Sequence, residues 1–228
     1  MASQQGIDGL HEIRNLLLGE EVGAIVAQNA VMEYVVSDAA ERNKEPILQI
    51  IAPVLSQTRR VLEIGSGTGT HALYFSARLP HLTWQPTDTG EYLPMLRERV
   101  KREGGANLLP AIELDVRNWA GEEVDAIYSA NTFHIMSWNS VHDFFEGVGT
   151  TLSKKGLLCV YGPFRYGDRY TSDSNAKFDQ FLQNRDPDSG LRDAYEVDKL
   201  ARERNLELLA DHAMPANNQL RIWQRRAS

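Results

Sequence analysis

The feature that most constrains this chain is a short apolar run that leads directly into three closely spaced glycines. Residues 61–64 are Val-Leu-Glu-Ile, and Gly65, Gly67 and Gly69 follow at every second position, before a helical pattern that starts at His71. Glycines at such positions permit a tight turn and let the backbone approach a ligand without a Cβ clash. The triplet alone is also consistent with a purely structural turn or a generic nucleotide loop.

The spacing of the glycines disfavours two common nucleotide loops. A dinucleotide loop of the form G-x-G-x-x-G needs its third glycine one residue later than Gly69. A P-loop needs Lys followed by Ser or Thr after its last glycine, and the sequence continues instead with Thr70 and His71. The loop therefore indicates a different ligand.

Short apolar runs alternate with helical patterns along most of the chain. Runs that predict strands lie at 61–64, 82–85, 108–114, 124–130 and 157–161, and patterns that predict helices lie at 71–79, 91–102, 140–152 and 194–205. This alternation is typical of a parallel sheet covered by helices on both faces. The runs at 206–212 and 219–225 have no helix between them and predict a hairpin. We therefore predict an α/β fold with a doubly wound, mostly parallel seven-stranded sheet and an antiparallel C-terminal hairpin.

Two segments interrupt the alternation. Residues 1–40 have helical character, notably at 10–18 and 22–36, and predict an N-terminal helical extension of a domain over 41–228. An apolar helix face begins at Ile47, and Pro46 suits the first turn of that helix. Residues 164–192 are rich in Gly, Asp, Ser, Asn and Arg, with one short helical pattern at 176–182. A connection of that length predicts an inserted cap.

Polar residues follow three of the predicted strands. Asp88 comes directly after the second strand, which extends to Thr87, Asp115 follows the third strand and precedes Val116, and Asn131 ends the fourth. In doubly wound sheets, ligands bind at the carboxyl ends of strands. Asp88 is placed to accept hydrogen bonds from both hydroxyls of a ribose, and Asp115 from an adenine amine. A helix N-cap or a surface role is the alternative for each carboxylate taken singly.

Several longer segments carry a resemblance to a known family. They include 41–48, the glycine loop, 84–88, 129–135, 161–163, 174–179, 185–187, 190–193 and 214–218. On these residues, the chain resembles class I S-adenosylmethionine-dependent methyltransferases over about 42–228, and among them the domain of unknown function 938, also called methyltransferase-like 26. Ser66, where alanine is common, and the longer N-terminus depart from the family pattern. Glu63 matches the acidic position of the methyltransferase loop.

The resemblance implies a Rossmann-like fold and S-adenosyl-L-methionine as the cofactor, with no settled general substrate. The residues expected at the cofactor are Arg42, Glu63, Gly65, Ser66, Gly67, Gly69, Asp88, Asp115, Val116 and Asn131.

The acceptor side is expected next to Asn131. His134 follows one helical turn later and has an ordinary pKa near neutral, so it could serve as a base or orient the acceptor. Tyr161 ends the fifth predicted strand at the same sheet edge. A strand cap for Asn131 and a structural histidine at 134 are the competing interpretations.

Other polar residues are candidates for contact with the substrate. They are Asn43, Lys44, Arg165, Asn175, Arg192, Asn217 and Asn218. Together they would suit a small polar molecule, and an arginine would offer a two-pronged bond to a carboxylate. Solvated loop residues are the default interpretation of each.

The composition of the chain disfavours several classes of binding partner. The formal net charge of -7 disfavours a nucleic-acid substrate, because phosphate binding needs clustered Lys and Arg. No apolar stretch reaches about 18 residues, so no membrane span is expected, and a cytoplasmic location is the default. Cys159 is the only cysteine, which excludes an intrachain disulfide and a thiolate metal cluster, and the histidines show no metal-ligand spacing.

These observations favour an enzyme that transfers a methyl group to nitrogen or oxygen of a small polar metabolite. A cofactor-binding module without turnover is the first alternative, and a protein methyltransferase is the second. The N-terminal helices could cover the pocket or form a homodimer interface.

Overall fold

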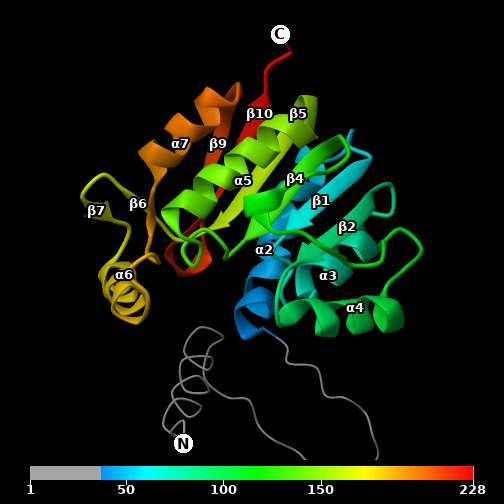
Figure 1. Cartoon of the computed structure of the whole chain (residues 1–228), viewed down its shortest axis with the longest axis horizontal. Coiled ribbons are helices and arrows are strands. Elements are labelled where there is room, and N and C mark those ends of the chain that lie inside the picture. The colour runs from blue at the N-terminus through cyan, green and yellow to red at the C-terminus, as the bar shows by residue number, and fades with distance from the viewer. Residues whose placement is uncertain (1–36, 228) are drawn as a thin grey trace, which may run out of the picture.

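The seven-stranded sheet predicted from the apolar runs forms the centre of the molecule (Figure 1). A computed structural model describes residues 37–227. The strands are β1 (Arg60–Ile64), β2 (Thr83–Asp88), β3 (Ile112–Glu113), β4 (Val124–Ala130), β5 (Leu152–Gly162), β9 (Leu206–Met214) and β10 (Asn218–Arg225). Their order in the sheet is β3-β2-β1-β4-β5-β10-β9. The first five pair in parallel, and β10 pairs antiparallel with both β5 and β9. The predicted fold class, with its antiparallel C-terminal hairpin, is therefore confirmed.

Helices cover both faces of the sheet, so the central strands are apolar on both sides. On one face lie α2 (Asp38–Val54), α3 (Thr70–Arg78) and α4 (Tyr92–Glu103), which bury Ile51, Phe75 and Leu96 around Trp84. On the other face, α5 (Trp138–Thr151) and α7 (Ala194–Glu203) pack Phe144 and Val197 with Trp223. Two separate apolar cores result, one on each side of the sheet.

The helix that precedes β1 starts earlier than its apolar pattern predicts. It begins at Asp38, where the Ser37 side chain accepts a hydrogen bond from the Ala40 N–H at 3.3 Å. Pro46 was expected in the first turn but lies inside the helix, as does Pro53. Burial of the apolar face, where Ile47 and Ile51 are fully buried, offsets the two backbone hydrogen bonds that these prolines cannot donate. The helical patterns at 10–18 and 22–36 lie outside the described residues.

The segment 164–192 is more regular than its composition suggests. Strands β6 (Phe164–Tyr166), β7 (Arg169–Tyr170) and β8 (Arg192–Asp193) form a second sheet in the order β7-β6-β8. The predicted helix at 176–182 lies within the longer α6 (Asp173–Arg185). This small subdomain stands beside the carboxyl end of β5, as Figure 1 shows.

Three further details bear on the sequence predictions. The run at 108–114 is mostly irregular, because only Ile112 and Glu113 form β3 while Leu108 makes a single bridge to Trp84. Cys159 is buried in β5, and that burial raises the pKa of its thiol to about 12, so the thiol is unreactive. Among residues 37–227, no helix combines the length and apolarity that crossing a membrane requires.

Candidate functional site

The glycine loop connects β1 to α3 with a left-handed backbone at each glycine. The φ angles of Gly65, Gly67 and Gly69 are 72°, 54° and 77°. A Cβ on Gly65 would collide with the Thr132 side chain, whereas a Cβ on Gly67 would meet no atom within 4 Å. The loop therefore packs closely against the chain after β4 at Gly65, and it leaves open space at Gly67.

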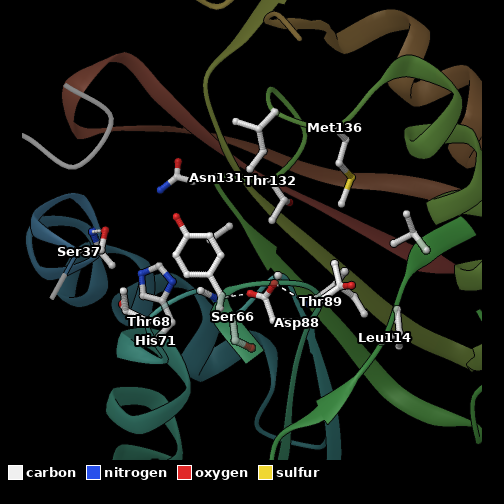
Figure 2. A pocket seen from close by; sticks show the side chains of 18 of the residues that line it. Ser37, Ser66, Thr68, His71, Asp88, Thr89, Leu114, Asn131, Thr132 and Met136 are labelled. Atoms are coloured by element: carbon white, nitrogen blue, oxygen red, sulfur yellow. Dashed lines mark hydrogen bonds between the residues drawn. The ribbon is translucent and has the colours of Figure 1, made fainter. Parts of the chain in front are cut away.

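That open space belongs to a cavity of about 400 Å³ at the carboxyl ends of β1, β2 and β4 (Figure 2). The Asp88 carboxylate accepts hydrogen bonds from the N–H groups of Gly67 at 2.6 Å and Thr89 at 2.7 Å. Partial burial raises the pKa of Asp88 above its ordinary value. Asp88 therefore holds the glycine loop in place while it faces the cavity.

Asp115 also lines this cavity, after β3. It caps the short 3₁₀ helix η1 (Val116–Asn118) and forms an ion pair with Arg117. Hydrogen bonds from Arg117 lower the pKa of Asp115. The carboxylate is therefore ionised near neutral pH, although it shares its oxygens with a neighbouring guanidinium.

A second cavity, of about 330 Å³, adjoins the first. The two share the lining residues Ser37, Tyr92, Asn131 and Ile135. Asn131 adopts a left-handed backbone with φ of 58°, and its N–H donates to the Tyr161 carbonyl at 2.9 Å. A non-glycine residue in that conformation is uncommon and asparagine tolerates it best. Asn131 thus stands where the two cavities meet.

His134 and the cap form one wall of the second cavity. The His134 ring is buried and packs edge-on against Phe178 of α6 at 5.4 Å between centroids. Burial first, and the nearby Arg192 charge second, lower the pKa of His134 to about 4. Asn175 of α6 also lines this cavity, so the predicted cap does reach the site.

The predicted cofactor residues divide into two groups. Those that line the first cavity are Gly65, Ser66, Gly67, Asp88, Asp115, Val116 and Asn131. Gly69 instead precedes α3 as its N-cap residue, and Arg42 is exposed and lines neither cavity.

Glu63 lies behind the loop, away from both cavities. Its side chain is buried in the core beside the sheet, and its carboxylate accepts a 2.8 Å hydrogen bond from the Trp84 indole. Burial raises the pKa of Glu63 to about 7. The strand position of Glu63 turns its side chain into the core, so the structure does not bring it to the cavity where the cofactor was expected.

Four predicted acceptor-side residues also lie elsewhere. Asn43 is buried and accepts a 2.6 Å hydrogen bond from His71 Nε2. Tyr161 lines neither cavity, and its phenol is hydrogen-bonded by the side chains of Asn43 and Asn218. Lys44 pairs with Glu41 at the surface. Asn217 is exposed, and its carbonyl accepts from Asn175. Asn43 and Lys44 are neighbours in α2 and therefore point to different sides of the helix. This explains why Asn43 is buried while Lys44 lies at the surface.

The two predicted arginines have structural partners. Arg165 forms an ion pair with Asp193 at 3.3 Å and lines neither cavity. Arg192 donates to the Phe133 carbonyl at 2.9 Å and also to the carbonyls of Met136 and Asp188. Neither guanidinium lines the two cavities, so the structure does not bring either arginine to the expected acceptor side. Their guanidinium groups tie the cap to the chain after β4.

Several lining residues escape sequence reasoning. In the first cavity they include His71, Thr89, Leu114, Thr132 and Met136, and in the second Tyr92, Ile135, Phe178 and Ala216. Thr89, Thr132 and Met136 lie within a few residues of a predicted strand end. Their closeness to that end in the sequence could have marked them as cavity residues. Nothing in the local sequence marks Tyr92 or Phe178, which tertiary packing brings to the site.

The sheet order, the glycine loop after β1 and the cavity at the strand ends define a class I methyltransferase fold. The chain belongs to the family described as protein of unknown function DUF938, whose model matches residues 34–225.

Solved structures agree with this fold. An O-methyltransferase family protein from Burkholderia thailandensis superposes with a TM-score of 0.70 at 19% identity, over 84% of this chain and 58% of that one. Human N-acetylserotonin methyltransferase in complex with SAM gives 0.71 at 14% identity, over 83% and 53%. PigF with SAH gives 0.65 at 16% identity, over 82% and 59%. The chain thus spans somewhat more than half the length of these proteins.

Proposed function

We propose that this protein is an S-adenosylmethionine-dependent methyltransferase that acts on nitrogen or oxygen of a small polar metabolite. The observation that carries the proposal is the meeting of two cavities at Asn131. The first has the features of an adenosine site, and the second has room for a small acceptor. Known small-molecule sites have volumes of about 300–1,000 Å³, so a cavity of about 330 Å³ fits a metabolite better than a protein segment.

The residues of the first cavity fit the parts of S-adenosylmethionine. Gly67 leaves space for the ligand against the backbone, and Asp88 is placed to accept from the ribose hydroxyls. Asp115 and Val116 would hold the adenine, with Asp115 accepting from its amine. The structurally similar proteins whose structures contain SAM or SAH support this choice of cofactor.

The bound cofactor supplies an electrophilic methyl group on a positively charged sulfur. Asn131 would orient the acceptor atom for in-line attack, a form of positioning that can lower a barrier by up to about 7–11 kcal/mol. The proton that leaves the acceptor would pass to water, and His134, whose lowered pKa of about 4 keeps its ring neutral, would orient the acceptor through a hydrogen bond. Both residues line the second cavity, which is why we assign them to the acceptor side.

Cofactor binding provides the test. Titration calorimetry on the full chain should show one site for S-adenosylmethionine and one for its demethylated product. Asp88→Ala should weaken both by about 1–3 kcal/mol, roughly 5- to 150-fold, because the ribose hydroxyls lose a charged acceptor.

The matched control is Asp168→Asn, which removes a carboxylate from an exposed turn. It should leave the affinity within about twofold. An absence of both binding heat and thermal shift at millimolar cofactor would rule out the proposed function.

A further inference from the structure

We infer that the second cavity selects an uncharged acceptor with a planar apolar part, in preference to a carboxylate, a phosphate or a protonated amine. The inference rests on the proposed methyltransferase function and narrows its substrate class.

The second cavity contains polar groups but no formal charge among its lining residues in 37–227. Its polar side chains include three amides, Asn131, Asn175 and Asn218, together with His134. The lowered pKa of His134, about 4, keeps the imidazole neutral at pH 7. Amides and a neutral imidazole donate and accept hydrogen bonds without supplying a counter-charge. They therefore suit polar groups that carry no net charge.

Three charged side chains of the cap, those of Arg165, Asp179 and Arg192, are already engaged. The guanidinium of Arg192 donates to three backbone carbonyls, and that of Arg165 pairs with Asp193. On α6, the Asp179 carboxylate accepts from the Leu191 N–H at 2.7 Å and from the Tyr170 hydroxyl at 2.6 Å. Recruiting any of these groups to a ligand would break buried or partly buried hydrogen bonds.

Helix ends do not replace the missing positive charge. The first turns of α2 and α6 both contribute lining residues, and a helix N-terminus carries a partial positive charge. Acidic side chains in the same turns, Asp38 and Glu41 in α2 and Asp173 in α6, offset that charge. The hydroxyls of Ser37 and Ser172 already accept from one N–H of each helix.

The energetic consequence is a penalty for ionic acceptors. An ion that leaves water without a partner loses several kcal/mol of solvation, and the lining that residues 37–227 provide offers no fixed opposite charge to offset the loss. An uncharged molecule avoids that cost and can pair with the Asn131 amide, since the NH2 groups of Asn175 and Asn218 already donate to neighbouring protein oxygens. Its apolar part would pack on Phe178, Tyr92, Ile135 and Pro163. Two of these are aromatic rings, which favours a flat molecule.

Three fragments of nearly equal shape test the inference: benzamide, benzoate and benzylammonium. Each is titrated into the full chain saturated with S-adenosylhomocysteine, and binding is followed by calorimetry and saturation-transfer NMR. We expect benzamide to bind at least about tenfold more tightly than either ion, in line with an unpaired buried charge. Equal or tighter binding of an ion, or no binding of benzamide at low millimolar concentration, would overturn the inference.

A pair of neighbouring variants sharpens the test. Asn218→Asp adds a negative charge to the cavity wall and should raise the affinity for benzylammonium by about tenfold. Asn217→Asp adds the same charge one residue away, on an exposed side chain that does not line the cavity. This variant should change the affinity for benzylammonium less than about twofold. Thermal melting confirms that both variants fold.

An equal effect of the two substitutions would mean that the fragments bind elsewhere, which contradicts the inference. Failure of S-adenosylhomocysteine to bind would reject the proposed function itself. Normal cofactor binding with a preference for ions would reject only the substrate class.

Discussion

At the scale of single residues, Gly67 combines a left-handed backbone with open space in front of it. Its φ is 54°, and an added Cβ would meet no protein atom within 4 Å. Gly90, in the turn after β2, has the same properties with φ of 61°, but it lines neither cavity. A comparison of substitutions at the two glycines can therefore distinguish the effect of backbone strain from the effect of lost ligand contact.

We predict that Gly67→Val abolishes binding of S-adenosylmethionine while Gly90→Val leaves it within about threefold. Both substitutions place a β-branched side chain at positive φ and should cost about 1–2 kcal/mol of stability. Only the first fills the cavity. Circular dichroism and titration calorimetry on both variants measure the two effects. Wild-type affinity in Gly67→Val would show that the loop is a structural turn only.

Glu63 predicts a specific pH dependence of stability. The residue is 2% exposed, and burial raises the pKa of its carboxyl from 4.5 to about 7. The folded state therefore binds this proton more tightly than the unfolded state. The resulting stability is complete below pH 4.5 and is lost as the pH rises through about 7.

Glu63→Gln removes this titration and keeps an oxygen that can accept from the Trp84 indole. Between about pH 4.5 and pH 8, the wild type should lose on the order of 3 kcal/mol of unfolding free energy relative to the variant. Urea denaturation at several pH values measures the difference in unfolding free energy between the wild type and the variant. The contributions of His71 and His134 cancel in this difference, because both proteins contain these histidines. Glu122→Gln, at an exposed ion pair, should show no such pH dependence. A pH-independent difference for Glu63→Gln would contradict the assigned pKa.

At the scale of elements, one buried hydrogen bond couples α2 to α3. His71 Nε2 donates to Asn43 at 2.6 Å, and Nδ1 accepts from the Tyr128 hydroxyl at 3.3 Å. The His71 ring also stacks on Phe75 at 5.2 Å. Burial lowers the pKa of His71 to about 3, so the ring is neutral in this arrangement. Because Ser37 and Ala40 of the same helix end line the first cavity, the position of α2 bears on the cofactor site.

We predict that Asn43→Ala lowers stability by about 1–3 kcal/mol, since it leaves the His71 N–H buried without an acceptor. Affinity for S-adenosylmethionine should fall several-fold as α2 loses this anchor. The double variant with His71→Phe should recover part of the stability, because both polar groups are then absent. Chemical denaturation of the four proteins of this cycle gives the coupling. Full additivity would show that the pair does not interact.

The cap shows how far an element can be predicted. Its length and position after β5 are visible in the sequence, and the helical pattern at 176–182 is correct. The three-stranded sheet is not visible, because β7 and β8 are only two residues long and have no period of their own. Arg192 was assigned to substrate from its residue type, yet its bonds to the chain after β4 depend on contacts about 60 positions apart in sequence.

At the scale of the whole molecule, Arg221 joins four elements. It lies in β10 with 1% exposure of its side chain. It pairs with Asp198 of α7 through two 2.8 Å hydrogen bonds and with Asp211 of β9. Its guanidinium also lies 5.8 Å from the ring centroid of Tyr166 in β6. The sheet edge, one covering helix and the cap therefore meet at this residue.

We predict that Arg221→Leu destabilises the protein by about 3–5 kcal/mol, because two carboxylates remain partly buried without their partner. Arg226→Leu removes an exposed ion pair with Glu207 and should cost at most about 1 kcal/mol. Urea denaturation of both variants gives the comparison. A loss below about 1 kcal/mol for Arg221→Leu would mean that Asp198 and Asp211 find other partners.

The sequence by itself determined the sheet and its cofactor edge. Apolar periodicity, the glycine spacing and the polar residues at strand ends are local signals. They predicted the sheet, and they put Asp88, Asp115 and Asn131 at strand ends, where all three line the first cavity. It also predicted the position of the cap. These features are readable because a buried strand and a turn each depend on a few adjacent residues.

Tertiary structure alone decided which polar side chains face the cavities. Glu63, Asn43, Arg165 and Arg192 have the residue types of a binding site, but each finds a buried or partly buried partner from a distant segment. Tyr92 and Phe178 carry no local signal and reach the site through packing. A side chain on a helix or strand can serve the core or a ligand, and the choice depends on partners that sequence spacing does not specify.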